Sequence, residues 1–140
     1  MKIFLVFVLL AFSISASPSQ TAQPKSVDWS KLNPDVIEIA MDGVDAIERM
    51  AEAVNDPSIP YGEREDEAEK IFQKLRRTVE SDADKRVLGD AASYHFQVSS
   101  CHIIYVDGNC SASSLSGAHD RAIDAIKQDK KKFLAAKGNK

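Results

Sequence analysis

The fold of this chain follows from residues 33–54, NPDVIEIAMDGVDAIERMAEAV, which have the pattern of one amphipathic helix. Asn33 is a residue type that caps helix N-termini, and Pro34 suits the first helical position because its missing N–H would find no partner there. The Asn-Asp-Pro sequence at 55–57 predicts the end of the helix. Apolar side chains recur every three or four positions, which is the spacing of one helix face. They are Val36, Ala40, Val44, Ile47, Met50 or Ala51, and Val54.

The same spacing predicts three further helices, over about residues 62–79, 82–105 and 115–134. The first of these begins with an acidic run, whose charges complement the positive end of a helix dipole. Strand signals are nearly absent, since the only β-prone run, 102–106, continues the helical spacing. Four amphipathic helices with short links predict an all-α fold, a small antiparallel four-helix bundle-like domain over residues 33–140.

The N-terminus has the three parts of a secretory signal peptide, which we place at residues 1–16. Lys2 precedes a short apolar run, and small residues follow it. A bilayer-spanning helix needs about 20 apolar residues, so we expect no membrane anchor after cleavage. Residues 17–32 contain two prolines and little apolar periodicity, which predicts a flexible leader whose end Trp29 and Leu32 could tie down. The predicted location is extracellular, or periplasmic if the source is bacterial.

Length and charge limit the classes of protein to which the chain can belong. Its 140 residues suffice for one domain. The 18 Lys and Arg against 21 Asp and Glu give a net charge of −3, which removal of Lys2 makes one unit more negative. Proteins that bind nucleic acid carry a basic patch, and no such patch is apparent here. We therefore expect no nucleic-acid partner.

The two cysteines, Cys101 and Cys110, are expected to form one intrachain disulfide, because an exported protein meets an oxidising environment. The alternative is a pair of free buried thiols. The bond would close a loop of ten residues, and the loop-closure model assigns it about 2.5–3 kcal/mol. Asn109, followed by Cys110 and Ser111, matches the acceptor pattern for N-glycosylation and is a candidate glycosylation site.

Catalytic and metal-binding patterns are weak in this sequence. His95 and His102 are seven positions apart on one predicted helix, about 10 Å along its axis, so they cannot chelate one metal ion together. His119, with Asp120 beside it, could join one of them from the last helix, although nothing in the sequence indicates that it does. No nucleophile elbow, phosphate-binding loop or zinc spacing occurs. We therefore expect no catalytic residues, no metal, no cofactor and no enzyme activity.

Two functions fit these observations. The first is a small secreted helical protein that acts by binding another protein, as inhibitors, immunity factors and delivered effectors do. The alternative is a carrier of a small apolar ligand in a cavity between helices, which would show as a pocket of several hundred cubic ångströms. The candidate lining residues are aromatic: Phe72, Tyr94, Phe96, Tyr105 and Phe133. The competing interpretation is that these residues simply fill the core.

Overall fold

The computed structural model describes residues 26–103 and 110–138, and these residues form helices without any strand. The prediction of an all-α bundle-like fold with one intrachain disulfide is confirmed. The described part of the chain has no helix that is both long and apolar enough to cross a membrane. The elements are the 3-10 helix η1 (Trp29–Lys31) and the α-helices α1 (Pro34–Asn55), α2 (Tyr61–Thr78), α3 (Asp82–Ile103) and α4 (Ala112–Gly138).

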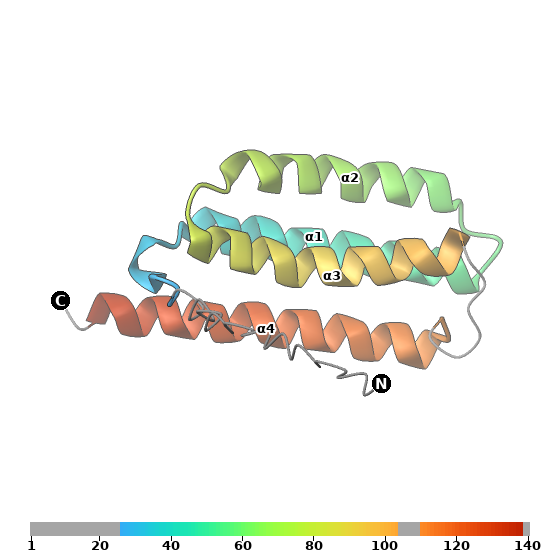
Figure 1. Ribbon diagram of the computed structural model, residues 1–140. Helices are drawn as coiled ribbons and strands as arrows, with labels where there is room; N and C mark the ends of the chain where they lie inside the picture. Colours follow the sequence, from blue (N-terminus) through green and yellow to red (C-terminus); the bar gives the residue numbers. More distant parts are fainter. Residues whose placement is uncertain (1–25, 104–109, 139–140) are drawn as a thin grey trace, which may run out of the picture.

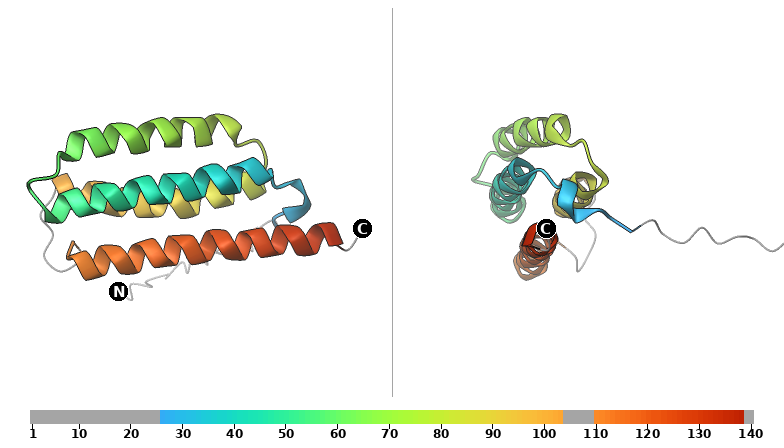
Figure 2. Two further views of the ribbon diagram at one scale, coloured as in Figure 1. Left: turned by 180° about the vertical axis from the view of Figure 1, so that it is seen from behind. Right: turned by 90° about the vertical axis from the view of Figure 1, so that its left-hand side faces the viewer.

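Helix α1 is the central element of the bundle. In Figure 1 the chain runs one way along α1 and α3 and the opposite way along α2 and α4. The end-on view in Figure 2 shows α1 and α3 side by side in the middle, with α2 on one side of them and α4 on the other. Helix α1 contacts all three other helices, and it buries eleven residues whereas α2 buries four. Its apolar stripe therefore supplies the largest share of the core.

The predicted start of α1 is confirmed. The Asn33 side chain accepts a hydrogen bond from the backbone N–H of Asp35 at 3.1 Å, and Pro34 occupies the first helical position. The helix ends at Asn55, where Asp56 accepts hydrogen bonds from the backbone and hydroxyl of Ser58 and closes a turn. The local chemistry at both ends thus matches what the sequence predicts.

The end of the predicted leader belongs to the packed domain. Asp28 caps η1 by accepting a hydrogen bond from the backbone N–H of Ser30. Leu32 is buried, and the ammonium group of Lys132 in α4 lies 4.6 Å from the centre of the Trp29 ring. Helix η1 contacts both α3 and α4. The structured domain therefore begins before Asn33, because the contacts of Trp29 and Leu32 extend it towards the N-terminus.

A glycine in the middle of α1 allows α2 to approach closely. A Cβ atom on Gly43 would lie only 3.1 Å from the ring of Phe72. That ring is 1% exposed, and its other neighbours include His95 of α3, stacked with its ring centre 4.8 Å away. The missing side chain at Gly43 thus makes room for the largest fully buried residue of α2.

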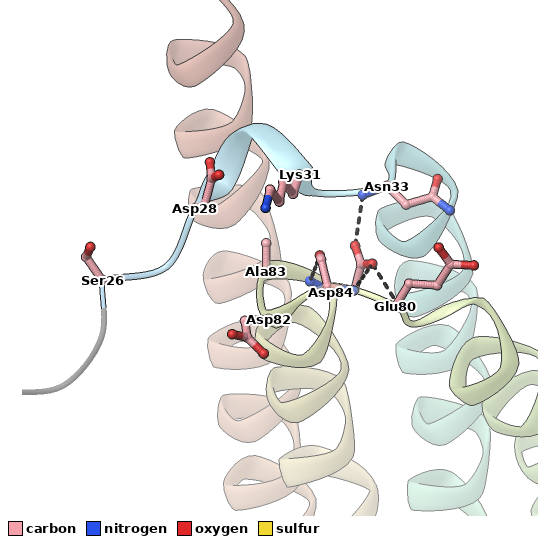
Figure 3. Close-up of a pocket in the computed structure, with 9 residues that line it drawn as sticks. Ser26, Asp28, Lys31, Asn33, Glu80, Asp82, Ala83 and Asp84 are labelled. Carbon is pink, nitrogen blue, oxygen red and sulfur yellow. Dashed lines mark hydrogen bonds between the residues drawn. The ribbon is translucent and has the colours of Figure 1, made fainter.

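The buried carboxylate of Asp84 joins three segments of the chain (Figure 3). It accepts hydrogen bonds from the backbone N–H of Asn33 at 2.8 Å, of Ser81 at 2.9 Å and of Glu80 at 3.1 Å. Burial alone would raise the pKa of Asp84, but these hydrogen bonds outweigh it and hold the pKa below its ordinary value of 3.8. The start of α1, the α2–α3 connection and the first turn of α3 therefore depend on one ionised side chain.

The disulfide lies at the opposite end of α3. Cys101 and Cys110 are bonded, with their Cα atoms 5.4 Å apart, so the predicted pairing is confirmed. The bond ties the last turn of α3 to the residues just before α4. The predicted continuation of the third helix to Tyr105 lies outside the described residues, as does the candidate glycosylation site Asn109.

Candidate functional site

The predicted lining residues do not surround a common cavity. Phe72, Tyr94 and Phe133 are buried in the core, at 1%, 2% and 5% exposure. Phe96 is 76% exposed and lies outside the core, so its assignment to a cavity lining is wrong. The physical reason is helix geometry: Phe96 follows Tyr94 by two positions, about 200° around the helix, and therefore faces away from it. Tyr105 lies outside the described residues.

Three pockets among the described residues are surface clefts between helix ends or along helix seams. Their volumes are about 580, 240 and 160 Å³. The largest, shown in Figure 3, lies where η1 meets the start of α3, and its walls carry Asp28, Lys31, Glu80 and Asp82. Neither Phe72 nor Phe133 lines any of the three. Tyr94 lines the two smaller clefts. Phe72 and Phe133 therefore fill the interior of the described bundle.

Two large apolar side chains stand exposed on one face of α3. Phe96 and Ile103 are 76% and 78% exposed, and their spacing of seven residues places them about two helical turns apart on the same face. Ser93 and Ser100 lie on this face too, and the Ser100 hydroxyl donates a hydrogen bond to the Phe96 carbonyl at 2.7 Å. We call these four residues the α3 outer face. Full burial of such side chains contributes about 1.5–3 kcal/mol each, so this face can supply binding energy.

A pair of carboxyl groups lies between α3 and α4. Asp129 is 2% exposed, and its Oδ1 accepts a hydrogen bond from the Lys132 ammonium at 2.8 Å. The second oxygen, Oδ2, has no hydrogen-bond partner among the described residues. Burial raises the pKa of Asp90, and so does the Asp129 carboxylate, which can accept the proton of Asp90 and carries a negative charge. A protonated Asp90 can donate to Asp129, whereas an ionised one repels it.

Replacing Asp90 with asparagine is therefore expected to stabilise the protein near neutral pH. Because the pKa of Asp90 is raised, protonated Asp90 stabilises the wild type fully below the unfolded pKa of 3.8. This stabilisation is lost as the pH rises through the folded pKa. The amide of Asp90→Asn can donate to Asp129 at every pH. The variant should therefore be more stable than the wild type by about 1 kcal/mol near pH 7, and about equally stable near pH 3, where Asp90 is itself protonated. Thermal unfolding at both pH values measures this difference, with the exposed Asp124→Asn as control. A loss of stability near pH 7 would show instead that attraction of Asp90 to Arg86 and Lys132 dominates.

The three histidines occupy separate places. His95 stacks on Phe72, and burial lowers the pKa of its imidazole; His102 stacks on Tyr61 with ring centres 3.6 Å apart. His119 is on α4, and its ring meets that of Tyr94 of α3 edge to face, with ring centres 5.8 Å apart. His119 therefore forms no common site with His95 or His102.

The surroundings of His119 are acidic. Its Nε2 lies 3.5 Å from a carboxylate oxygen of Glu48, and its Nδ1 lies 3.3 Å from one of Asp120. One ligand atom each from Asp45, Glu48 and His119 lies within 4.8 Å of the others. Sequence reasoning noted His119 and Asp120 but missed the two acids of α1. The signal for them was their spacing of three residues, which places both on one side of the helix.

Comparisons of the chain with protein-family models, with curated proteins and with solved structures give no match.

Proposed function

We propose that this chain is a small secreted helical protein that acts by binding another protein, with the α3 outer face as its binding surface. The observation that carries the proposal is the exposure of Phe96 and Ile103, at 76% and 78%, on one face of one helix. Single exposed apolar residues are common, but two large ones on one helix face form a patch that a partner can bury. Helix faces with anchors one or two turns apart are a frequent mode of protein recognition.

The chemistry of this face favours a protein partner. Protein interfaces place aromatic and aliphatic anchors at the centre and polar groups around them, and Ser93 and Ser100 provide small polar groups beside Phe96. The disulfide at Cys101 holds the end of α3 close to these anchors. A surface that is rigid before binding loses less conformational entropy on binding, which increases affinity.

The carrier alternative receives less support from the clefts. Sites for small ligands are usually about 300–1,000 Å³ and mostly apolar. Of the clefts of about 580, 240 and 160 Å³, only the first falls in this range, and acidic side chains such as Asp28, Glu80 and Asp82 line it. A small apolar molecule would find few contacts there.

The test compares polar substitutions on and off the α3 outer face. We expect Phe96→Ser and Ile103→Ser each to weaken the complex with the natural protein partner at least tenfold, which corresponds to about 1.4 kcal/mol. The matched control is Leu134→Ser, which removes a leucine of α4 that is 56% exposed. Native mass spectrometry of the protein from its own source identifies the partner, and titration with that purified partner measures the affinities.

Each outcome decides between the alternatives. Loss of affinity in the two α3 variants with retention in the Leu134 variant supports the proposal. Equal affinity of all three variants for the partner excludes the α3 outer face as the binding surface. A co-purifying mass of lipid size, without a second polypeptide, would favour the carrier function instead.

A further inference from the structure

We propose that Asp45, Glu48 and His119 form a binding site for a divalent transition-metal ion of the zinc class. Asp45 and Glu48 are three positions apart on α1, and His119 is on α4, which packs against α1. The site would thus link the central helix to the last one. It lies apart from the α3 outer face and does not depend on the function proposed for that face.

The spacing of the ligand atoms suits one shared ion. In a tetrahedral zinc site with ligand bonds of about 2.0–2.1 Å, neighbouring ligand atoms are about 3.3 Å apart. The Glu48 carboxylate and the His119 Nε2 are already 3.5 Å apart, and Asp45 completes a group whose ligand atoms lie within 4.8 Å. Both carboxylates are on exposed residues, so they can change rotamer and close the remaining gap without disturbing the core.

The second observation is the position of the His119 ring. Its Nε2 is buried and has no hydrogen-bond partner among the described residues, although it faces the Glu48 carboxylate. A hydrogen on Nδ1 can be donated to Asp120, which leaves the lone pair of Nε2 directed at Glu48. In that tautomer two electron pairs face each other, and a cation between them relieves the repulsion. A carboxylate behind a metal-ligating histidine, as Asp120 is here, is the usual support of such a ligand.

The donor set and its surroundings select the class of ion. One imidazole nitrogen with two carboxylates suits zinc and its neighbours, whereas calcium and magnesium prefer sites made of oxygen alone. The surroundings are acidic, because a carboxylate oxygen of Asp120 lies 3.3 Å from the other ring nitrogen of His119. Three protein ligands leave the fourth position open for water or for a side chain of a bound partner.

The experiment titrates tag-free, disulfide-bonded protein with zinc by calorimetry and with cobalt by visible absorption. We expect one ion per chain and a cobalt spectrum of a low-coordinate site with nitrogen and oxygen ligands. The double variant Asp45→Asn with Glu48→Gln should lose at least tenfold in affinity, and His119→Gln should lose a similar amount. Asp120→Asn should weaken binding by about tenfold to a hundredfold because it removes only the supporting carboxylate.

Matched controls separate this site from general attraction to acidic surface. Glu63→Gln with Asp66→Asn removes two exposed acids at the same spacing from α2, and His102→Gln removes an exposed histidine. Both controls should bind zinc as the wild type does. The proposal is wrong if the wild type binds no stoichiometric ion, or if the control pair weakens binding as much as the Asp45 and Glu48 pair. Because Asp45 and Glu48 are exposed, their variants should keep the helical circular dichroism of the wild type, so a loss of binding reports on the site.

Discussion

Asp84→Ala is expected to lower the free energy of unfolding by about 3–5 kcal/mol, as measured by denaturant unfolding near pH 7. The substitution removes the acceptor for three backbone N–H groups, those of Asn33, Glu80 and Ser81, around a residue that is 1% exposed. The three donors lose a charged acceptor, and a hydrogen bond to a charged group contributes about 1.5–3 kcal/mol. A loss of this size is a large part of the 5–15 kcal/mol that stabilises a typical domain.

The pH dependence gives an independent check on Asp84. Its pKa lies below the ordinary value of 3.8, so its contribution is present above that value and is lost as the pH falls through the folded pKa. The wild type should therefore lose stability below about pH 3.8 more steeply than Asp84→Ala does. The neighbouring Asp82→Ala is the control, since that acid is exposed and its ion pair with Lys85 contributes at most about 1 kcal/mol. A cost below 1 kcal/mol for Asp84→Ala near neutral pH would mean that water replaces the carboxylate.

Phe72→Ala is expected to lower the free energy of unfolding by about 3–5 kcal/mol. The ring is 1% exposed and is enclosed by the backbone of α1 at Gly43 and by the ring of His95. Its removal loses the transfer free energy of the ring and leaves a cavity that these neighbours can close only in part.

The same chemical change at Phe96 provides the control for Phe72. Phe96→Ala should alter stability by less than about 0.5 kcal/mol, because that ring is 76% exposed in the isolated protein. Urea unfolding of both variants measures the difference. Equal effects of the two substitutions would contradict the division between a filled core and an exposed α3 outer face.

The sequence predicts the features of this fold that are local. The Asn33 cap, the spacing of the α1 stripe and the disulfide all follow from residues close together in the chain. The third helix is more ambiguous, because apolar residues occur around much of its circumference between 87 and 104. Its pattern alone therefore does not separate Phe96 from the core residues near it.

The candidate metal site and the role of Asp84 could not be predicted, because they depend on contacts between helices. The alignment of α4 along α1 decides whether His119 lies beside Asp45 and Glu48. The apolar spacing within each helix does not determine this alignment. Asp84 resembles an ordinary acid in the first turn of a helix until the N–H of Asn33, 51 positions away, is brought to its carboxylate.

The central position of α1 has a consequence for the order in which the chain is made. This helix is synthesised before any of the helices that it contacts, and α4 ends at Gly138, more than 80 residues after Asn55. At 5–20 residues per second, the α1 stripe waits on the order of 10 s for its last partner to be complete. During that interval the part of α1 that packs on α4 is exposed to whatever surrounds the growing chain. The first of the four α-helices is thus fully buried only when the last one is complete.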